Sequence, residues 1–521
     1  MTFDLSQSMQ LIAALTPDII VMAGAMILML AAAWGRDSVE RQRGVGIASI
    51  GVCVIAGVVI LWFIARGTTA TAGVIAADNF RWIADLVFLA ATAGTIALML
   101  DYNEREEILP AEAHVLVLFA CAGMMMLAAA RDLVLVFLGI EMMSIATYIL
   151  TGMNRRSARS AEGAIKYFLL GAFSTSFLLY GIALVYGATG STNLQVIAAR
   201  IGGEHLLGSA MLPIGISLLL IGFAFKVAAA PFRQWAPDAY DGAPTPITAY
   251  MAAAVKAAAF AAFLRVWLEA FPNAIGAWHA ALWWLAVVTM VAGNVIALAQ
   301  RNIKRMLAYS SIAHAGYLLV AVTTGTGLGS SAFLFYIVAY TLATFGAFGV
   351  VVALGETGEP SLMIDDYAGL WGERPWLSLA MAIFLLALLG FPIFGGAGFF
   401  AKWYIVQAAL QSTSPQSRLA VILVVTSVVS AGYYMGVIMV MFMKPRPEAL
   451  PVPTARVGGA TRWVIGLAAV ILIALGIFPN ALVRATQSEG TALSAPATTP
   501  ASPTAPNVTV LRAPPQEALA R

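Results

Sequence analysis

The chain has 521 residues, of which 61% are hydrophobic and 11% are charged. Soluble domains carry about 25% charged residues, so this composition excludes a soluble globular protein and indicates a polytopic membrane protein. The net charge of +3 is small and the basic residues are scattered, which excludes a basic face for nucleic acid. The two cysteines, Cys53 and Cys121, lie far apart in apolar segments and predict neither a disulfide framework nor a metal site.

Apolar segments long enough to cross a bilayer recur along nearly the whole chain, without strand-like alternation of polar and apolar residues. Because a backbone in lipid must satisfy its own hydrogen bonds, the sequence predicts an all-α polytopic membrane protein with about 14 transmembrane helices. The N-terminus lacks a basic n-region, so the first apolar run is predicted to be a retained span. The predicted spans are residues 11–34, 45–65, 82–100, 112–130, 132–152, 163–187, 211–230, 245–269, 278–299, 304–324, 329–354, 376–411 with a break, 418–442 and 463–484.

Basic residues are distributed unevenly between alternate connections. Sixteen lie in the set of connections that runs from Arg36 to Arg462, whereas five lie in the opposite set. Basic connections stay in the cytoplasm, so an even number of spans predicts that both termini face the outside. The C-terminal tail adds Arg484, Arg512 and Arg521 to this count. The five basic residues that remain of the 29 lie within spans and form the functional shortlist: Lys166, Lys226, Lys256, Arg265 and Lys402.

Two of these lysines flank a polar joint in KVAAAPFRQWAPDAYDGAPTPITAYMAAAVK. Lys226 is followed by Pro231, which removes a backbone donor and interrupts the helix. Lys256 lies ten residues beyond Pro246, about 15 Å along the helix and near the bilayer midplane. An ammonium at that depth costs about 2.5–3.5 kcal/mol on insertion scales, so such residues indicate a path for protons or ions.

A second interrupted helix precedes Lys402 in LLALLGFPIFGGAGFFAKWYI, which contains a proline and several glycines. Broken helices at corresponding places in two halves are typical of inverted-repeat transporters, because unwound backbone is tolerated only where it lines a polar cavity. The pattern predicts two inverted five-helix repeats with broken helices 7 and 12. The alternative is that these prolines and glycines make ordinary packing kinks.

The chain therefore divides into five predicted segments. Helices 1–3 occupy 1–110, the first repeat (helices 4–8) 111–270, the second repeat (helices 9–13) 271–445, and helix 14 446–485. The tail, 486–521, is rich in proline, alanine and threonine. It has too few large apolar residues to bury a core and is predicted to be disordered.

Glu141 lies about nine residues into the fifth predicted span, with Arg131 at the mouth as the only basic residue of that segment. A lone glutamate in lipid would be protonated, so Glu141 is predicted to face an internal cation, either Lys226 or Lys166. At about 6 Å and an effective dielectric near 20, such a pair interacts by about 2.8 kcal/mol, enough to decide whether a neighbouring lysine keeps its proton. The alternative is a structural ion pair that fixes the helix register.

Three further features have structural interpretations. Arg265, with Glu269 at i+4, is predicted to be an interfacial anchor. His314 is either a satisfied structural histidine or a neutral proton carrier between the halves, and the pair Tyr433 and Tyr434 is predicted to serve packing. The four histidines follow no HExxH or haem pattern, so no redox centre is predicted on this chain.

Several ordered motifs between residues 110 and 445 together resemble one family. DLVLVFLGIEMMSIATYIL, the joint quoted above, IKRMLAYSSIAHAGYLL and GFFAKWYI are similar to the antiporter-like subunits of respiratory complex I, the NADH-quinone oxidoreductase. Within that family, PDAYDGAPTP, AYSSIAHAGY and the lysine of broken helix 12 look most like the subunit N branch. The resemblance implies a fourteen-helix fold with two inverted five-helix repeats. The expected location is a bacterial inner membrane, where the distribution of basic residues predicts both termini on the periplasmic side.

The resemblance also implies a proton relay through the buried ionisable residues. Glu141 becomes the glutamate of helix 5 and Lys226 its partner on broken helix 7, while Lys402 lies on the route to the outside. The implied relay is Glu141, Lys226, Lys256 and Lys402, with Lys166 and His314 as possible further members. The chain departs from the family at PFRQW, where Arg233 replaces a histidine. Arginine does not release its proton, so Arg233 is predicted to act as a fixed charge.

The function implied is that of a proton-translocating membrane subunit that couples quinone reduction elsewhere to proton transfer. No cofactor is expected on this chain; NADH, FMN, iron–sulfur clusters and quinone are expected in partner subunits. The expected partners are other membrane and peripheral subunits of complex I, especially neighbouring antiporter-like subunits, and lipid. The alternatives are a subunit of a multisubunit cation/proton antiporter and an assembly subunit that does not itself pump.

Overall fold

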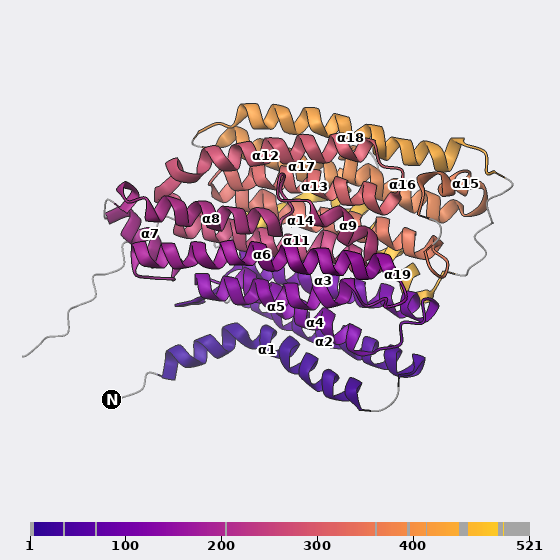
Figure 1. Cartoon of the computed structure of the whole chain (residues 1–521), viewed down its shortest axis with the longest axis horizontal. Coiled ribbons are helices and arrows are strands. Elements are labelled where there is room, and N and C mark those ends of the chain that lie inside the picture. Colours follow the sequence, from indigo (N-terminus) through magenta and orange to yellow (C-terminus); the bar gives the residue numbers. More distant parts are fainter. Residues whose placement is uncertain are drawn as a thin grey trace, which may run out of the picture.

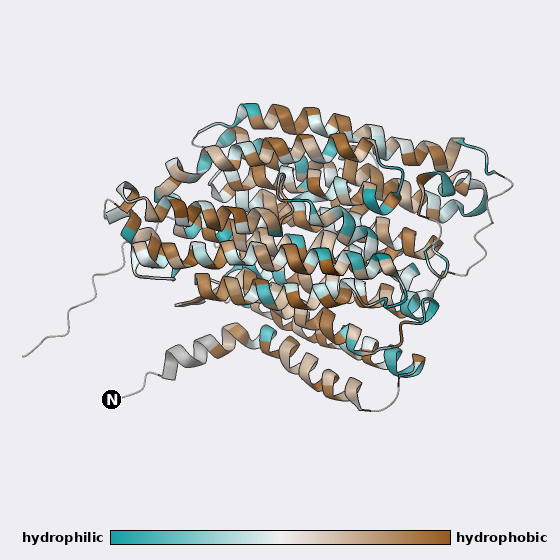
Figure 2. Cartoon of the chain, in the orientation of Figure 1, coloured by the Kyte–Doolittle hydropathy of each residue, from teal (hydrophilic) through white to brown (hydrophobic). Residues whose placement is uncertain are grey.

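A computed structural model describes residues 5–34, 37–67, 70–203, 206–359, 362–392, 396–412, 414–447, 457–487 and 493 of the chain. These residues form a bundle in which most helices run side by side along one direction, with α1 and α2 at one edge and α18 at the opposite edge (Figure 1). Apolar residues cover the helices, and hydrophilic residues are concentrated towards the helix ends (Figure 2). The predicted all-α membrane class is confirmed.

The N-terminal part contains α1 (Leu5–Ala33), α2 (Val39–Arg66), β1 (Ala70–Ala72), β2 (Ile75–Ala77), α3 (Asn79–Arg105), α4 (Glu112–Ala129), α5 (Leu133–Thr151), α6 (Ala158–Thr189), α7 (Leu194–Gly203), η1 (Leu206–Gly208), α8 (Met211–Lys226), α9 (Trp235–Gly242), α10 (Thr245–Tyr250), η2 (Met251–Val255) and α11 (Lys256–Ala270). The β1 and β2 strands form an antiparallel hairpin. Neither this hairpin nor α7 is predicted from the sequence, because both are too short for a periodicity to be recognised.

The C-terminal part contains η3 (Pro272–Ala274), α12 (Ile275–Leu298), α13 (Ile303–Thr323), α14 (Gly327–Leu354), η4 (Ile364–Tyr367), α15 (Leu370–Glu373), α16 (Pro375–Leu389), α17 (Gly396–Gln411), α18 (Ser417–Met443), α19 (Gly459–Ile477) and α20 (Pro479–Gln487). The last predicted span, 463–484, is too long: α19 ends at Ile477 and a separate helix begins at Pro479, because proline removes the donor that would continue the helix. Beyond residue 487, the tail predicted to be disordered lies outside the described residues, except for residue 493. Gly395, a glycine of the second predicted break, also lies outside them.

Twelve helices in the described part of the chain are long and apolar enough to cross a membrane. Two further apolar helices, α8 and α16, are shorter, because each is the first half of an interrupted helix. Every predicted span overlaps one of these helices. The total of fourteen spans and the inverted repeats stay predictions.

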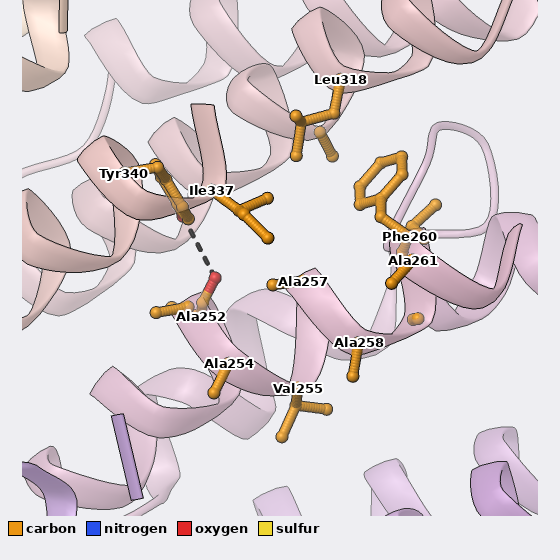
Figure 3. Close-up of a cluster of buried hydrophobic side chains, with 14 of the residues drawn as sticks. Ala252, Ala254, Val255, Ala257, Ala258, Phe260, Ala261, Leu318, Ile337 and Tyr340 are labelled. Atoms are coloured by element: carbon orange, nitrogen blue, oxygen red, sulfur yellow. Dashed lines mark hydrogen bonds between the residues drawn. The ribbon is translucent and has the colours of Figure 1, made fainter. Parts of the chain in front are cut away.

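Two helical segments form the centre of the bundle. The most apolar window of Thr245–Ala270 is 100% buried and that of α13 is 94% buried, against 22% for α1 and for α19. The central segment is rich in alanine, which lets neighbouring helices approach closely. Figure 3 shows its alanines opposite Leu318 and Ile337, with the Tyr340 hydroxyl donating to the Ala252 carbonyl at 3.2 Å. The bundle therefore places Lys256 and His314 in its most enclosed region.

Candidate functional site

The first interrupted helix places Lys226 at its break. Lys226 is the last residue of α8, and the chain then passes through Ala228 at φ 56° before α9 begins. The Lys226 side chain is buried, and its Nζ donates to Ser144 Oγ at 2.9 Å and to the Tyr148 hydroxyl at 3.3 Å. Both acceptors lie on α5. Two hydroxyl groups thus replace the water that an ammonium would otherwise bind.

Glu141 lies one turn before Ser144 on α5. Its Oε1 accepts a hydrogen bond from Thr175 Oγ1 on α6 at 2.8 Å. The carboxylate is within electrostatic range of Lys226, but Glu141 makes no ion pair within 4 Å among the described residues. Of the two predicted cations, the structure therefore brings Glu141 close to Lys226 and not to Lys166.

Lys166 belongs instead to a surface cluster of ion pairs. Its Nζ lies 2.6 Å from Glu162 and 2.8 Å from Asp238, and its side chain is 42% exposed. Arg305 contacts the same Asp238 at 3.1 Å. Burial raises the pKa of Asp238, but the hydrogen bonds and charges of Lys166 and Arg305 outweigh it and leave that pKa below its ordinary value. Lys166 is therefore held by carboxylates at the edge of the bundle.

Lys256 follows directly on a π-helical turn, η2, in the central helical segment. Single π turns inside α-helices occur frequently at functional sites. The Lys256 Nζ donates to both the main-chain carbonyl and the hydroxyl of Ser311, each at 2.8 Å, and it lies 6.0 Å from the centroid of the Tyr240 ring. The ammonium is fully enclosed, and all of these partners are neutral.

His314 lies between the second and the third lysine. Its Nδ1 is 2.6 Å from the Tyr336 hydroxyl and its Nε2 is 3.2 Å from the Tyr434 hydroxyl, which also forms a hydrogen bond with Ser310. The imidazole is within electrostatic range of both Lys256 and Lys402. A neutral imidazole has one donor and one acceptor nitrogen, so both hydroxyl contacts can be satisfied at once.

The pair Tyr433 and Tyr434 does more than the predicted packing. Tyr434 contacts His314 as described, and the Tyr433 hydroxyl donates to Asn294 Oδ1 at 3.0 Å. Asn294 in turn donates to the Tyr317 hydroxyl at 3.0 Å. Both tyrosines therefore belong to a buried polar network.

The second interrupted helix places Lys402 at its break. The first half, α16, ends at Leu389, and Gly390 follows at φ 80°, a left-handed conformation that glycine adopts without strain. The Lys402 Nζ donates to the Leu389 carbonyl at 2.8 Å and lies 4.9 Å from the centroid of the Tyr317 ring. The ammonium thus occupies the C-terminal, electronegative end of α16.

Arg265 and Arg233 differ in their surroundings. Arg265 pairs with Glu269 at 2.7 Å, as predicted, and also with Asp78 at 2.9 Å. Its side chain is wholly buried, so the prediction of an anchor reaching the membrane surface is wrong, because two carboxylates inside the bundle satisfy the guanidinium. Burial raises the pKa of Asp78, but the charges of Arg265 and Arg131 outweigh it and leave that pKa below its ordinary value. Arg233 lines a cavity of about 540 Å³, with its guanidinium 5.4 Å from the centroid of the Tyr309 ring.

Sequence reasoning missed the partners of the buried lysines. On α5, Ser144 and Tyr148 follow Glu141 at i+3 and i+7, a polar stripe on one face of an apolar helix. On α13, Ser311 and His314 repeat the i+3 part of this spacing. Such stripes are a signal that periodicity analysis can find, although it does not reveal which helix they face.

The site consists of three buried ammonium groups hydrogen-bonded to hydroxyl or carbonyl oxygens, two of them beside interrupted helices. Among the described residues, no group of three or more histidine, cysteine or acidic side chains is placed to hold a metal ion. Amines with neutral partners in a bundle of this architecture define an antiporter-like membrane protein that handles protons or cations.

Comparisons with known proteins identify the family within the class of antiporter-like membrane proteins. The family described as NADH:quinone oxidoreductase/Mrp antiporter, TM, matches residues 130–430. A NADH-quinone oxidoreductase subunit N from Gemmatimonas aurantiaca is 50% identical, covering 94% of this chain and 95% of the relative. The chain belongs to the NADH-quinone oxidoreductase subunit N family, which confirms the resemblance read from the motifs.

Solved structures agree with this assignment. A chain of respiratory complex I from Thermus thermophilus is 35% identical with a TM-score of 0.76, covering 90% of this chain and 98% of that chain. A chain of the Mrp complex from Dietzia sp. DQ12-45-1b superposes with a TM-score of 0.79 but is only 20% identical, covering 92% and 96% of the two chains, and this likeness shows the fold alone. The higher identity to subunit N favours the complex I interpretation over a cation/proton antiporter.

Proposed function

We propose that this chain translocates protons as a membrane subunit of an NADH-quinone oxidoreductase, driven by quinone reduction in partner subunits. One observation carries the proposal. Lys226, Lys256 and Lys402 are 6%, 2% and 8% exposed, and none of them makes an ion pair among the described residues. A buried amine without a carboxylate at contact distance can lose its proton without leaving an unpaired carboxylate behind, which a proton relay requires.

The proposed relay begins at Glu141 and Lys226 on the cytoplasmic side. The proton passes to Lys256 near the midplane, then through the region of His314 to Lys402, and leaves on the periplasmic side. Attraction by Glu141 favours the charged form of Lys226 and therefore sets when that lysine releases its proton. Moving one charge through about 150 mV costs about 3.5 kcal/mol, comparable to one close charge interaction.

The remaining candidate residues have supporting roles in this proposal. His314 is a possible carrier between Lys256 and Lys402, because it contacts two hydroxyl groups and interacts with both lysines. Lys166 is a possible member at the cytoplasmic surface, where it is paired with Glu162 and Asp238. Arg233 acts as a fixed charge because its guanidinium does not release a proton.

The proposal also includes the arrangement of the chain in the membrane and in the complex. The fourth to eighth predicted spans (111–270) and the ninth to thirteenth predicted spans (271–445) form two inverted repeats. The positive-inside bias predicts that both termini lie on the periplasmic side of the inner membrane. NADH, FMN, iron–sulfur clusters and quinone bind to partner subunits. The direct neighbours are other antiporter-like membrane subunits.

Proton stoichiometry in the assembled complex tests the proposal. We expect Lys226→Ala and Lys256→Ala to lose most proton pumping per NADH oxidised in membrane vesicles. Lys444→Ala serves as a control, because Lys444 is an exposed lysine that pairs with Asp365 at 2.9 Å. Full stoichiometry in either variant refutes the role assigned to that residue. Loss of assembled complex in proportion to lost activity would instead support an assembly subunit that does not pump.

A further inference from the structure

A cavity of about 750 Å³ lies beside the Lys226 site. It is bounded by the connection between α3 and α4, the first turns of α4, the C-terminal end of α5 and the start of α6. Its lining includes the exposed Arg155 and Arg156 of a connection that the positive-inside bias assigns to the cytoplasm. On α5 the lining residues are Tyr148, Ile149 and Leu150, in the last turn of the helix. The cavity therefore reaches from the cytoplasmic connections to the tyrosine that contacts Lys226.

Tyr148 touches both the cavity and the relay. It lines the cavity, while its hydroxyl accepts the hydrogen bond from Lys226 at 3.3 Å. Its ring is held edge-on against the ring of Tyr167, with centroids 4.5 Å apart, and against Phe168, with centroids 5.8 Å apart. The residue is only 7% exposed. Tyr148 thus contacts both the cavity and the first lysine of the site.

Gly171 on α6 makes the room that this hydroxyl occupies. A Cβ atom at position 171 would lie 2.0 Å from the Tyr148 hydroxyl oxygen and 2.7 Å from Cζ of the same ring. No side chain fits there without moving the phenol. Position 171 therefore sets the position of the Tyr148 hydroxyl independently of any change to Tyr148 itself.

We propose that this cavity is the site where protons bound for Lys226 are taken up, and that Tyr148 passes them on. The inference rests on the proposed function and adds a route and a residue to it. When Lys226 is neutral, the Tyr148 hydroxyl gives its proton to the amine and receives one from protonated water in the cavity, so the phenol is neutral before and after. Four carboxylates (Asp37, Glu106, Glu107 and Glu112) and two arginines (Arg155 and Arg156) line the cavity. Arg156 pairs with Glu107, and Arg105, outside the lining, pairs with Glu106. Four carboxylates against three arginines leave one net negative charge, which raises the local concentration of protonated water.

Tyr148→Phe is the first test, because it keeps the ring and removes only the hydroxyl. We expect proton pumping coupled to NADH oxidation to fall about tenfold in the assembled complex. The solvent deuterium isotope effect on turnover should rise, because proton uptake becomes the slow step, and lower cytoplasmic pH should restore part of the rate. Tyr180→Phe is the matched control, since Tyr180 is an exposed tyrosine of α6. A purely structural role of Tyr148 would change assembly but neither the isotope effect nor the pH profile.

Gly171→Ala tests the same hydroxyl without altering Tyr148. We expect the added methyl group to displace the phenol and to reproduce the Tyr148→Phe phenotype. Gly44→Ala is the control, because a Cβ atom at position 44 meets nothing within 4 Å.

A blocking experiment tests the cavity even where the Gly171 variant fails to assemble. Leu116 lines the cavity, and Ala161 is an exposed residue outside the lining. The two native cysteines are buried. In inverted membrane vesicles, a bulky membrane-impermeant thiol reagent should inhibit proton pumping by Leu116→Cys and leave Ala161→Cys active.

The outcomes separate this inference from the proposed function. If Lys226→Ala abolishes pumping while Tyr148→Phe, Gly171→Ala and labelled Leu116→Cys pump at native rates, the uptake route is wrong and the proposed function stands. If Lys226→Ala itself pumps fully, the proposed function fails. Inhibition of Leu116→Cys only from the periplasmic side would overturn the cytoplasmic assignment of the cavity.

Discussion

Two groups of buried cations, one near the ends of long helices and one in the middle of the bundle or at helix breaks, have different partners. Arg81, Arg265 and Lys304 have wholly buried side chains, and each lies within ion-pair distance of a carboxylate. Lys226, Lys256 and Lys402 donate to hydroxyl or main-chain carbonyl groups instead. Removing one member of a buried ion pair costs about 3–5 kcal/mol because the other charge is left unpaired. The comparison teaches that burial alone does not distinguish these two groups of cations; under the proposed function, burial with neutral partners is what marks a proton carrier.

Lys256→Met should give the largest loss of proton pumping and is the strongest test of the difference between the two groups of cations. Methionine keeps the length of the side chain and removes the amine, so proton pumping should fall by about two orders of magnitude or more. No carboxylate loses its partner, so assembly and the thermal midpoint of the complex should be unchanged or slightly raised. Proton flux and thermal unfolding, measured on the same preparation, check both parts. A thermal midpoint that falls together with pumping would assign Lys256 to the structural group.

Arg265→Met should have the opposite pattern. It leaves Asp78 and Glu269 buried without their guanidinium, so the loss should be about 3–5 kcal/mol of folding free energy. We expect a low yield of assembled complex and normal proton stoichiometry in the fraction that assembles. Arg66→Met is the matched control, because Arg66 is exposed and lies over the Trp62 ring. Normal assembly of the Arg265 variant would contradict the structural role.

The sequence predicts where the buried lysines lie better than it predicts what they touch. Every predicted span overlaps a helix of the structure, and Pro231 and Gly390 locate both helix breaks, because these signals are local in the chain. The partners of Lys226 and Lys256 lie on other helices, and contacts between helices depend on how each helix is rotated in the bundle. The sequence alone does not determine that rotation.

The same limit applies to Arg81 and Lys304, two cations that are not among the five basic residues predicted to lie within spans. Arg81 and Lys304 lie near helix N-termini, where a long side chain ordinarily extends to water. In the structure both are wholly buried, because Asp85 and Asp18 contact Arg81 while Glu359 contacts Lys304 at 3.0 Å. Asp85 is the i+4 neighbour of Arg81 on α3, whereas Asp18 lies on α1 and Glu359 lies in the connection after α14. No local spacing in the sequence indicates the pairs with Asp18 and Glu359.

Glu359→Gln tests whether the buried ion pair between Lys304 and Glu359 stabilises the fold, through the pH dependence of stability. Burial raises the pKa of Glu359, but the charge of Lys304 and hydrogen bonds from Thr245, Lys304 and Tyr102 outweigh it and leave that pKa below its ordinary value of 4.5. A carboxyl with a lowered pKa contributes stability above its ordinary pKa and loses it as the pH falls through the folded-state pKa. The glutamine variant should therefore lose about 2 kcal/mol at pH 7.

The pH series gives the control for this prediction. The native complex should lose stability as the pH falls below about 4.5, and the glutamine variant should lose less over that range because its side chain does not titrate. Glu373→Gln, at an exposed glutamate of α15, should follow the native curve. Parallel curves for the native and Glu359→Gln complexes would show that the Lys304 pair contributes little.

Lys166→Gln should have the smallest effect on proton pumping. It tests whether a lysine in an exposed ion pair takes part in the proton relay. Lys166 has two carboxylate partners, but its side chain is 42% exposed, and exposed pairs contribute only about 0–1 kcal/mol. We expect assembly to be unchanged and pumping to fall less than about twofold, because Asp238 keeps Arg305 as a partner at 3.1 Å. Proton flux at low and at high salt measures this directly. A tenfold loss of proton pumping would show that Lys166 belongs to the relay. Hydrogen bonding to neutral partners would then distinguish relay lysines only in the middle of the bundle.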